Sequence, residues 1–305
     1  MPFFTTTAQL RNCVAGTCLG LLVTTMLVYT MLVRMSGLQA VDAVLQTAQS
    51  NAVQRDPADP AQPKLAFNGQ RSYGYLKTLC DYGNRMSGSP GMKQQQSLLE
   101  KHFRELGASV SYQRFKAKDP LNGRRVPMAN MIVQWHPDAE RRILLCAHYD
   151  TRPLPDRELN PRLRQNGVFV GANDGASGVA LLMELGNHAR QLPINYGLDF
   201  VLFDGEELVY FDGRKDIGSY FAGSTWFARQ YATHPPQHQY VAGVLFDMVA
   251  DAQLTLYQEK HSATWKETRP LVKEIWGTAQ RLGIKEFIPR AKSGVNDDSF
   301  PFYQI

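Results

Sequence analysis

Two adjacent carboxylates, Glu206 and Glu207, directly follow a stretch that predicts a buried strand. The stretch is Leu198–Phe203, which is rich in apolar, strand-forming residues and is followed by Asp204-Gly205. Neighbouring residues that leave a strand point in different directions, so one carboxylate could bind a metal ion while the other exchanges protons with a substrate. Ligands of open α/β sheets bind beyond the carboxyl ends of the strands, where this pair is expected. A solvated acidic turn is the alternative interpretation of the pair alone.

Three further segments carry side chains of the kinds that bind metals. His148 follows the apolar run Arg142–Cys146, Asp174 lies in a glycine-rich loop before a predicted helix, and Asp247 follows Ala242–Phe246. Imidazole and carboxylate ligands suit zinc, and a catalytic zinc keeps one position open for substrate. Alone, His148 could be a core histidine and Asp174 a helix N-terminal residue. Four such segments, each next to a predicted strand or helix, favour one shared site.

The elements that must position these residues alternate between strand and helix patterns. Apolar residues at helical spacing predict four helices, which are Gln70–Tyr82, a helix from Pro90 to Leu106, Ser177–Ala189 and Arg269–Leu282. Apolar or alternating runs predict five strands, which are Ser109–Phe115, Asn130–Trp135, Arg142–Cys146, Leu198–Phe203 and Ala242–Phe246. The fold class is therefore α/β, with a central, mostly parallel, twisted sheet and helices on both faces.

The N-terminus predicts a membrane anchor. Cys13–Val33 contains no charged residue and is flanked by Arg11 and Arg34, and about 20 apolar residues span a bilayer as a helix. We expect an uncleaved, single-pass signal anchor whose short N-terminal tail leaves the catalytic part outside the cytoplasm. A cleaved signal peptide ending near Val41–Ala43 is the alternative.

Composition and length place the rest of the 305-residue chain in one globular domain. The expected division is a transmembrane helix in residues 1–35, a flexible linker rich in Ala, Gln, Asp and Pro in 36–64, and a catalytic domain in 65–305. The net charge of +5 is spread without a long basic block, so we expect no nucleic-acid partner. Cys80 and Cys146 are expected as buried thiols, with a single bridge as the alternative.

The chain resembles the zinc peptidases of family M28. The motifs HYD, GANDGASG, FDGEE and LFD occur in the order and spacing of that family, whose fold is the phosphorylase/hydrolase-like α/β sandwich of zinc exopeptidases. Within the family the chain is more similar to the glutaminyl-peptide cyclotransferases (glutaminyl cyclases). A long segment separates Glu207 from Gly223-Ser224, as it does in the cyclases, and DDSFPF (Asp297–Phe302) is similar to their DDHxPF segment.

The resemblance implies a role for each matching residue. Asp174 and Glu207 would bind a single zinc ion, and Glu206 would be the general acid/base. Asp247 and Asp297 would form a carboxylate relay beside Glu206.

The resemblance also implies the substrate and its surroundings. The reaction would convert the N-terminal glutamine of peptides or proteins to pyroglutamate with release of ammonia. Tyr210 or Phe211 would form part of the substrate pocket, and His148 would lie beside the metal, becoming a ligand only in a di-zinc variant. The alternatives are a zinc aminopeptidase of the same family and a non-catalytic, membrane-held homologue that binds peptides.

The family pattern is not complete in this sequence. The third zinc ligand of the family is a histidine well beyond the DDHxPF-like segment, whereas no histidine follows His261 here and Ser299 replaces the histidine within that segment. We expect the sequence to be cut short, with Phe302–Ile305 as the start of a buried strand, and the chain as given to have an incomplete zinc site and little activity. The alternatives are a degenerate, non-catalytic member and a rearranged site that recruits His148.

Overall fold

The structure is a computed structural model that describes residues 30–31 and 67–304. The linker predicted for residues 36–64, and all of the predicted membrane segment except Thr30 and Met31, lie outside the described residues. Within the described part, no helix is both long and apolar enough to cross a membrane.

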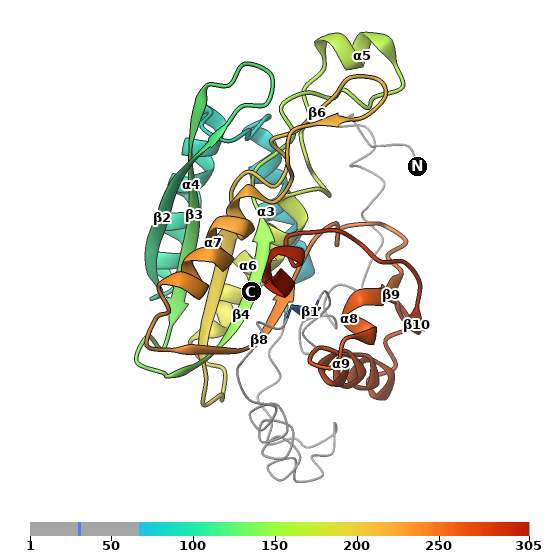
Figure 1. Cartoon of the computed structure of the whole chain (residues 1–305). Helices are drawn as coiled ribbons and strands as arrows, with labels where there is room; N and C mark the ends of the chain where they lie inside the picture. Colours follow the sequence, from blue (N-terminus) through green and yellow to red (C-terminus); the bar gives the residue numbers. More distant parts are fainter. Residues whose placement is uncertain (1–29, 32–66, 305) are drawn as a thin grey trace.

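A six-stranded mixed sheet forms the centre of the molecule (Figure 1). Its order is β1-β8-β4-β5-β3-β2, with bounds β1 Thr30–Met31, β2 Ser109–Lys118, β3 Arg125–Trp135, β4 Arg141–His148, β5 Gly197–Phe203 and β8 Gln239–Leu245. The three central strands β8, β4 and β5 are parallel, as predicted, whereas β1 pairs antiparallel with β8, β3 with β5, and β2 with β3. The outer pair differs from the prediction because β2 and β3 form a hairpin, whose short connection permits only antiparallel pairing.

Side-chain alternation divides the core into two layers. Along β5, Phe200 and Leu202 face one buried cluster, while Val201 and Phe203 face the other. Every residue of β5 is buried, because a strand covered on both faces by helices has no solvent side. This is the strand that carries the FDGEE turn at its end.

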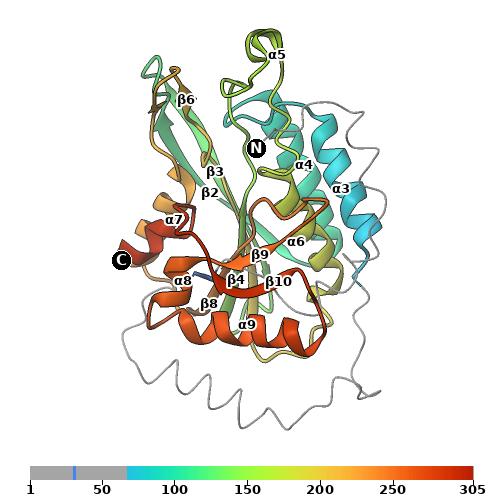
Figure 2. The same ribbon diagram turned by 90° about the vertical axis from the view of Figure 1, so that its right-hand side faces the viewer.

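Helices cover both faces of the sheet (Figures 1 and 2). One face carries α3 (Gly69–Asp81), α4 (Pro90–Glu105) and α6 (Ala176–Ala189), and the other carries α7 (Ala222–Thr233). α9 (Arg269–Arg281) extends the first layer through Val272, Ile275 and Trp276. The α3, α4, α6 and α9 predictions are confirmed within one or two residues at each end, whereas α7 was not predicted.

Short elements complete the chain. They are α5 (Pro161–Asn166), β6 (Tyr210–Phe211), β7 (Asp216–Ile217), β9 (Leu256–Gln258), α8 (Lys260–Thr264), β10 (Phe287–Ala291) and a 3-10 helix, η2 (Phe300–Gln304). In both views α5 and β6 lie at the same end of the molecule, near the level of the tip of the β2–β3 hairpin. Both elements therefore belong to the loops that border the ends of the central strands.

Two predictions differ from the structure near the chain ends. Thr30 and Met31, which belong to the predicted membrane helix, form strand β1 on the edge of β8, because an edge strand offers unpaired backbone groups. The strand predicted at Phe302 is wrong: Phe300–Gln304 is a 3-10 helix that begins next to Asp297, with Phe302 buried against Phe203 and Phe227. Pro301 favours this compact turn over a sheet strand, since it lacks a donor for a ladder hydrogen bond.

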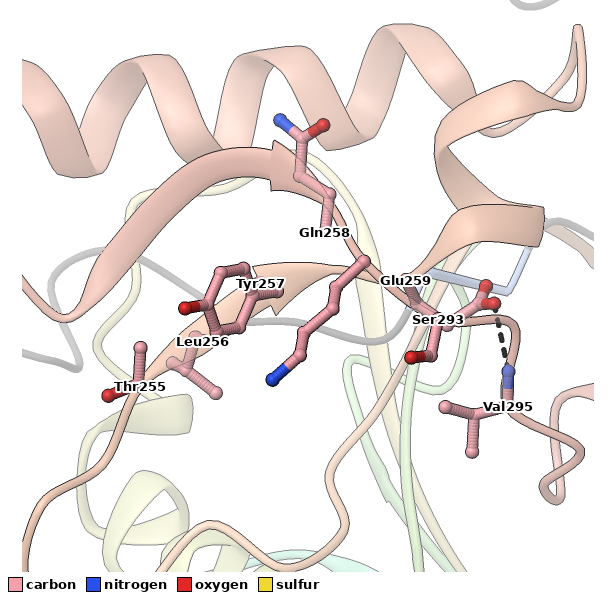
Figure 3. Close-up of a pocket in the computed structure, with 8 residues that line it drawn as sticks. Thr255, Leu256, Tyr257, Gln258, Glu259, Ser293 and Val295 are labelled. Atoms are coloured by element: carbon pink, nitrogen blue, oxygen red, sulfur yellow. Dashed lines mark hydrogen bonds between the residues drawn. The ribbon is translucent and has the colours of Figure 1, made fainter.

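A small pocket lies between β9 and the segment after β10 (Figure 3). Glu259 at its edge accepts backbone hydrogen bonds from His261, Ser262 and Val295, so its carboxylate is fully engaged in holding the loop. None of the acidic residues predicted to do chemistry lines this pocket. The candidate site therefore lies elsewhere, at the ends of the central strands.

Candidate metal centre

The paired glutamates lie in a turn that Asp150 fixes. The Asp150 carboxylate accepts hydrogen bonds from the backbone N–H of Glu206 and of Glu207, both at 3.0 Å. Gly205 precedes them with φ +80°, and a Cβ there would lie 2.7 Å from Met128 Sδ. The end of β5 thus needs a glycine followed by two residues whose amides point at one carboxylate, and this holds both glutamates rigidly.

His148 is the centre of an acidic cluster. Its Nε2 lies 3.1 Å from Asp174 Oδ1 and 3.3 Å from Asp247 Oδ1, and its Nδ1 lies 3.9 Å from Glu206 Oε2. Burial lowers the pKa of His148, but the carboxylates of Asp150, Asp174 and Asp247 outweigh it and raise that pKa well above its usual value. The ends of β4, β5 and β8 and the loop before α6 therefore meet at one point, as the sequence predicts.

A buried arginine holds the loop that carries Asp174. Arg85 donates from Nη1 to the carbonyl of Val170 at 2.9 Å and from Nη2 to that of Gly171 at 3.1 Å. The loop ends at Gly175, whose φ is +90° and where a Cβ would lie 2.7 Å from the Asp150 carbonyl oxygen and 3.2 Å from His148 Cε1. The backbone before α6 is thereby fixed on both sides of Asp174.

Two further carboxylates close the cluster from the C-terminal segment. Asp297 and Asp298 are both buried, and Ser224 Oγ at the start of α7 donates to Asp298 Oδ1 at 2.5 Å. Burial, and then the charges of Asp247 and Asp298, raise the pKa of Asp297 well above its usual range. Asp297 is therefore close enough to Asp247 for their charges to interact, while the carboxylate relay between them stays a prediction.

The site concentrates negative charge in a buried volume. Burial is the largest cause of the raised pKa of Glu206, Glu207 and Asp247, and neighbouring carboxylates add to it. The pKa rises to about 7 for both Glu207 and Asp298. Such a cluster gains most from a multivalent cation, which neutralises several carboxylates at once.

The donor atoms fit a divalent metal such as zinc. One atom from each of His148, Asp174 and Asp247 lies within 4.8 Å of the other two, which is close enough to hold one ion. Among the described residues of this cluster, Asp298 Oδ2 is buried without a hydrogen-bond partner, and His148 Nδ1 and Asp247 Oδ1 have only ion-pair contacts, at 3.6 Å to Asp150 Oδ1 and 3.3 Å to His148 Nε2. Buried polar atoms normally find partners, so unpaired ones in an acidic cluster indicate a ligand.

The predicted site residues differ in how closely they gather. Asp174, Asp247, Glu206 and Asp297 lie around His148, whereas the Glu207 carboxylate extends to Arg152, with Nη1 to Oε2 at 2.9 Å. The predicted pair of ligands, Asp174 and Glu207, is near enough for the charge of the first to raise the pKa of the second.

The predicted substrate wall lies in β6. Tyr210 Oη donates to Asp119 Oδ2 at 3.4 Å, and the Phe211 backbone N–H donates to Asp156 Oδ2 at 2.6 Å. Both side chains are half-buried. Their contact with a substrate stays a prediction.

Sequence reasoning missed several residues of the site. Arg152, Asp216 and Asp298 were given no role, although Arg152 is only two residues past Asp150 at the end of β4 and Asp298 is next to Asp297. A charged residue so close to a strand end was the available signal for Arg152. Asp216 gave no comparable signal, because it begins the two-residue strand β7, whose position depends on tertiary contacts.

Comparison with known proteins identifies the same family as the sequence motifs do. The profile of peptidase family M28 matches residues 130–305, more than half of the chain. The chain belongs to peptidase family M28. This confirms the resemblance that the four motifs predict, with its α/β fold.

The individual relatives include glutaminyl cyclases and an aminopeptidase precursor. A glutaminyl cyclase structure from Fimbriiglobus ruber is 37% identical with a TM-score of 0.74, covering 82% of this chain and 85% of that one. A structure described as a leucine aminopeptidase precursor from Bacteroides thetaiotaomicron is 25% identical with a TM-score of 0.70, covering 78% and 81%. A glutaminyl-peptide cyclotransferase-like protein of Bos taurus is 30% identical over 43% of this chain and 34% of its own length. The matched segments span between 34% and 63% of the curated relatives.

Proposed function

We propose that this protein is a zinc-dependent glutaminyl-peptide cyclotransferase, which converts the N-terminal glutamine of peptides or proteins to pyroglutamate and releases ammonia. The observation that carries the proposal is the rigid placement of Glu206 beside His148, with Glu207 next to it on the Asp150-fixed turn. The similarity to the Fimbriiglobus ruber glutaminyl cyclase favours this reaction among those of the family.

The substrate brings both reacting groups to the site. The α-amine of an N-terminal glutamine attacks its own side-chain amide, so the protein mainly has to hold the glutamine folded and move protons. Holding reacting groups together in this way is worth up to roughly 7–11 kcal/mol in ideal cases. Tyr210 and Phe211 are the candidates to hold the glutamine side chain in place.

Glu206 is the candidate general acid/base. Its buried position raises the pKa well above the usual range for a carboxyl, which makes it a better proton acceptor than an exposed glutamate. It would accept the proton of the attacking α-amine and return it to the departing ammonia. Asp247 and Asp297 would hold the shared proton of the relay.

Zinc is the cofactor that the donor set suits, and when bound it would polarise the substrate amide carbonyl as a Lewis acid. Asp174 and Glu207 are the proposed ligands from the described residues. Asp174 also belongs to the tighter group with His148 and Asp247, so it would be shared in a di-zinc site. The group of His148, Asp174 and Asp247 is the observation that favours the alternative function, a zinc aminopeptidase.

A substrate panel separates the two functions. The zinc-loaded protein is incubated with peptides that begin with glutamine and with aminoacyl anilides. A cyclase releases one ammonia for each glutaminyl peptide, leaves the peptide bonds intact and ignores the anilides. Release of free N-terminal residues or of aniline would instead establish the aminopeptidase, and binding of glutaminyl peptides without any product would establish a non-catalytic homologue.

We also propose that residues 13–33 anchor the protein in a membrane as a single span, with the catalytic domain outside the cytoplasm; in the anchored protein Thr30 and Met31 would belong to that span and not to β1. The support is the uncharged stretch between Arg11 and Arg34, whose length matches a bilayer. Alkaline carbonate extraction tests this. The full chain should remain with the membrane pellet, whereas a chain starting at residue 36 should be released; release of both would remove the anchor.

A further inference from the structure

Arg152 joins the candidate metal centre to the segment that follows the paired glutamates. Its side chain is only 5% exposed, and Nη1 donates to Glu207 Oε2 at 2.9 Å. Nε donates to Asp156 Oδ1 at 2.8 Å, and Nη2 donates to Asp216 Oδ1 at 3.1 Å. One planar guanidinium therefore engages three carboxylates from three different positions in the chain, which only the forked geometry of arginine permits.

Two more side chains, those of Tyr220 and Arg157, contact Asp216; together with Arg152 and its three carboxylates they form one junction. Tyr220 Oη donates to Asp216 Oδ2 at 3.0 Å and accepts from Arg152 Nη1 at 3.3 Å. Arg157 Nη2 donates to Asp216 Oδ2 at 2.6 Å. Asp216 begins β7, so the hairpin of β6 and β7 is tied through Arg152 to the Glu207 carboxylate.

The charges of the junction nearly cancel except at Glu207. The two guanidiniums of Arg152 and Arg157 balance the carboxylates of Asp156 and Asp216, which leaves the charge of Glu207 for another cation. Arg152 therefore adds little net repulsion against a metal ion. Its effect on metal binding should come from the position that it gives to Glu207.

Glu207 is held at both its backbone and its side chain. Asp150 accepts its N–H, and Arg152 engages Oε2, which leaves Oε1 as the oxygen that can turn to a metal. A carboxylate fixed in this way has lost its freedom before a metal arrives, so binding costs less conformational entropy.

We propose that Arg152 is a positioning residue: it holds Oε2 of Glu207 so that this carboxylate binds zinc through Oε1 alone, and it couples the β6–β7 hairpin to the metal centre. The proposal rests on the proposed function only in taking Glu207 as a zinc ligand. It concerns no other step of the reaction.

The test measures zinc affinity by competition with a chelator, in the full chain and in three variants. Arg152→Ala should weaken zinc binding by about 10- to 100-fold, the loss usual when a partner of a metal ligand is removed. Arg152→Lys should also be weaker than the parent chain, because lysine restores the charge without the fork. Arg157→Ala is the matched control: it removes a half-exposed guanidinium of the same junction that does not touch Glu207, so its affinity should stay within about twofold.

Thermal melting of the metal-free variants measures the folded fraction to which each affinity is normalised, and if Arg152→Ala does not fold, Arg152→Lys carries the test. The proposal is overturned if Arg152→Ala binds zinc like the parent chain, if Arg152→Lys restores the parent affinity, or if Arg157→Ala loses as much as Arg152→Ala. A parent chain that binds no zinc overturns it too. A parent chain that binds zinc but releases no ammonia would refute the cyclase and leave this inference standing.

Discussion

At the scale of single residues, the candidate site is a set of buried acids around one histidine. His148 touches or approaches four carboxylates, and Glu206 and Glu207 differ in their surroundings although they are adjacent. Glu206 faces His148, whereas Glu207 faces Arg152. Two neighbouring glutamates with different partners can divide a proton-transfer role and a metal-binding role between them.

The first prediction concerns that division. Glu206→Gln keeps the shape of the side chain and its place on the turn but removes the group that carries the proton. We expect turnover of glutaminyl peptides to fall by about 10²- to 10⁴-fold while zinc content stays at the parent level. Metal analysis and an ammonia assay on the same preparation check both halves. Retained turnover would assign the proton transfer to another residue.

The second prediction concerns pH and the buried acids. A carboxyl such as Asp298 ionises near its usual 3.8 in the unfolded chain but has a pKa of about 7 when folded, and Glu207 behaves likewise. The folded state then binds more protons than the unfolded state between these values, so stability must fall as pH rises from about 4 to 7. His148 adds in the same direction, because its pKa is raised and it holds its proton longer when folded.

Melting curves of the metal-free and zinc-loaded protein measure this effect. A loss of about 1 kcal/mol lowers the Tm of a domain of this size by roughly 2–4 °C, so the trend is measurable. We expect the Tm of the metal-free protein to drop across this window and zinc to remove most of the drop. A metal-free Tm that rises with pH would show that the carboxyls are ionised in the folded state.

At the scale of elements, close packing of α6 against β8 sets the distance between Asp174 and Asp247. Gly178 is the contact: a Cβ there would lie 2.2 Å from the Phe246 carbonyl oxygen and 2.9 Å from Ala147 Cβ. Only glycine lets the helix approach the strand end this closely. The loop before α6, which carries Asp174, and the segment just after β8, which carries Asp247, are thus held at one fixed separation.

The third prediction follows from this contact. Gly178→Ala should force α6 away from β8, destabilise the protein by about 1–3 kcal/mol and weaken zinc binding. Gly74→Ala in α3 is the matched control, because a Cβ there meets nothing within 4 Å; it should be neutral or stabilising by up to about 1 kcal/mol. Urea denaturation of both variants provides the comparison. Equal effects would mean that the helix contact is not the reason for the glycine.

The periodic elements could be predicted from the sequence, and those that depend on tertiary contacts could not. β5 and α6 have apolar patterns strong enough to locate them within a residue or so. By contrast, the N-cap of α7 is Phe221, which has φ +67° and makes no side-chain capping hydrogen bond, so the start of the helix gives no local signal. Asp199 is a charged residue within the apolar run of β5. It is buried and pairs with Arg142, and Tyr240 Oη donates to it at 2.6 Å.

The acidic site was predictable in part because the ends of its strands could be located from the sequence. Parallel strands must end at the same edge, so residues placed just after β4, β5 and β8 were bound to converge. The partner that each side chain takes was not predictable, because it depends on rotamers and on loops from elsewhere in the chain. The bond between Glu207 and Arg152 is the clearest case.

At the scale of the whole molecule, the chain is a mixed α/β domain whose reactive groups gather at one end of its parallel strands. α5 and β6 lie at the same end of the molecule (Figures 1 and 2). The ion pairs of Arg152 with Asp156 and Asp216 join these outer loops to the metal centre. A peptide substrate that contacted the loops would therefore also affect the metal centre.

The location of the bound metal tests this arrangement most directly. Crystals of the zinc-loaded protein, measured at the zinc absorption edge, give an anomalous difference map that places the ion independently of the protein density. We predict one peak at about 2.0–2.2 Å from an oxygen of Asp174 and from Oε1 of Glu207, with Oε2 still held by Arg152. A peak bound by His148 and Asp247 with Glu207 remote from it, or no peak at all, would contradict the account.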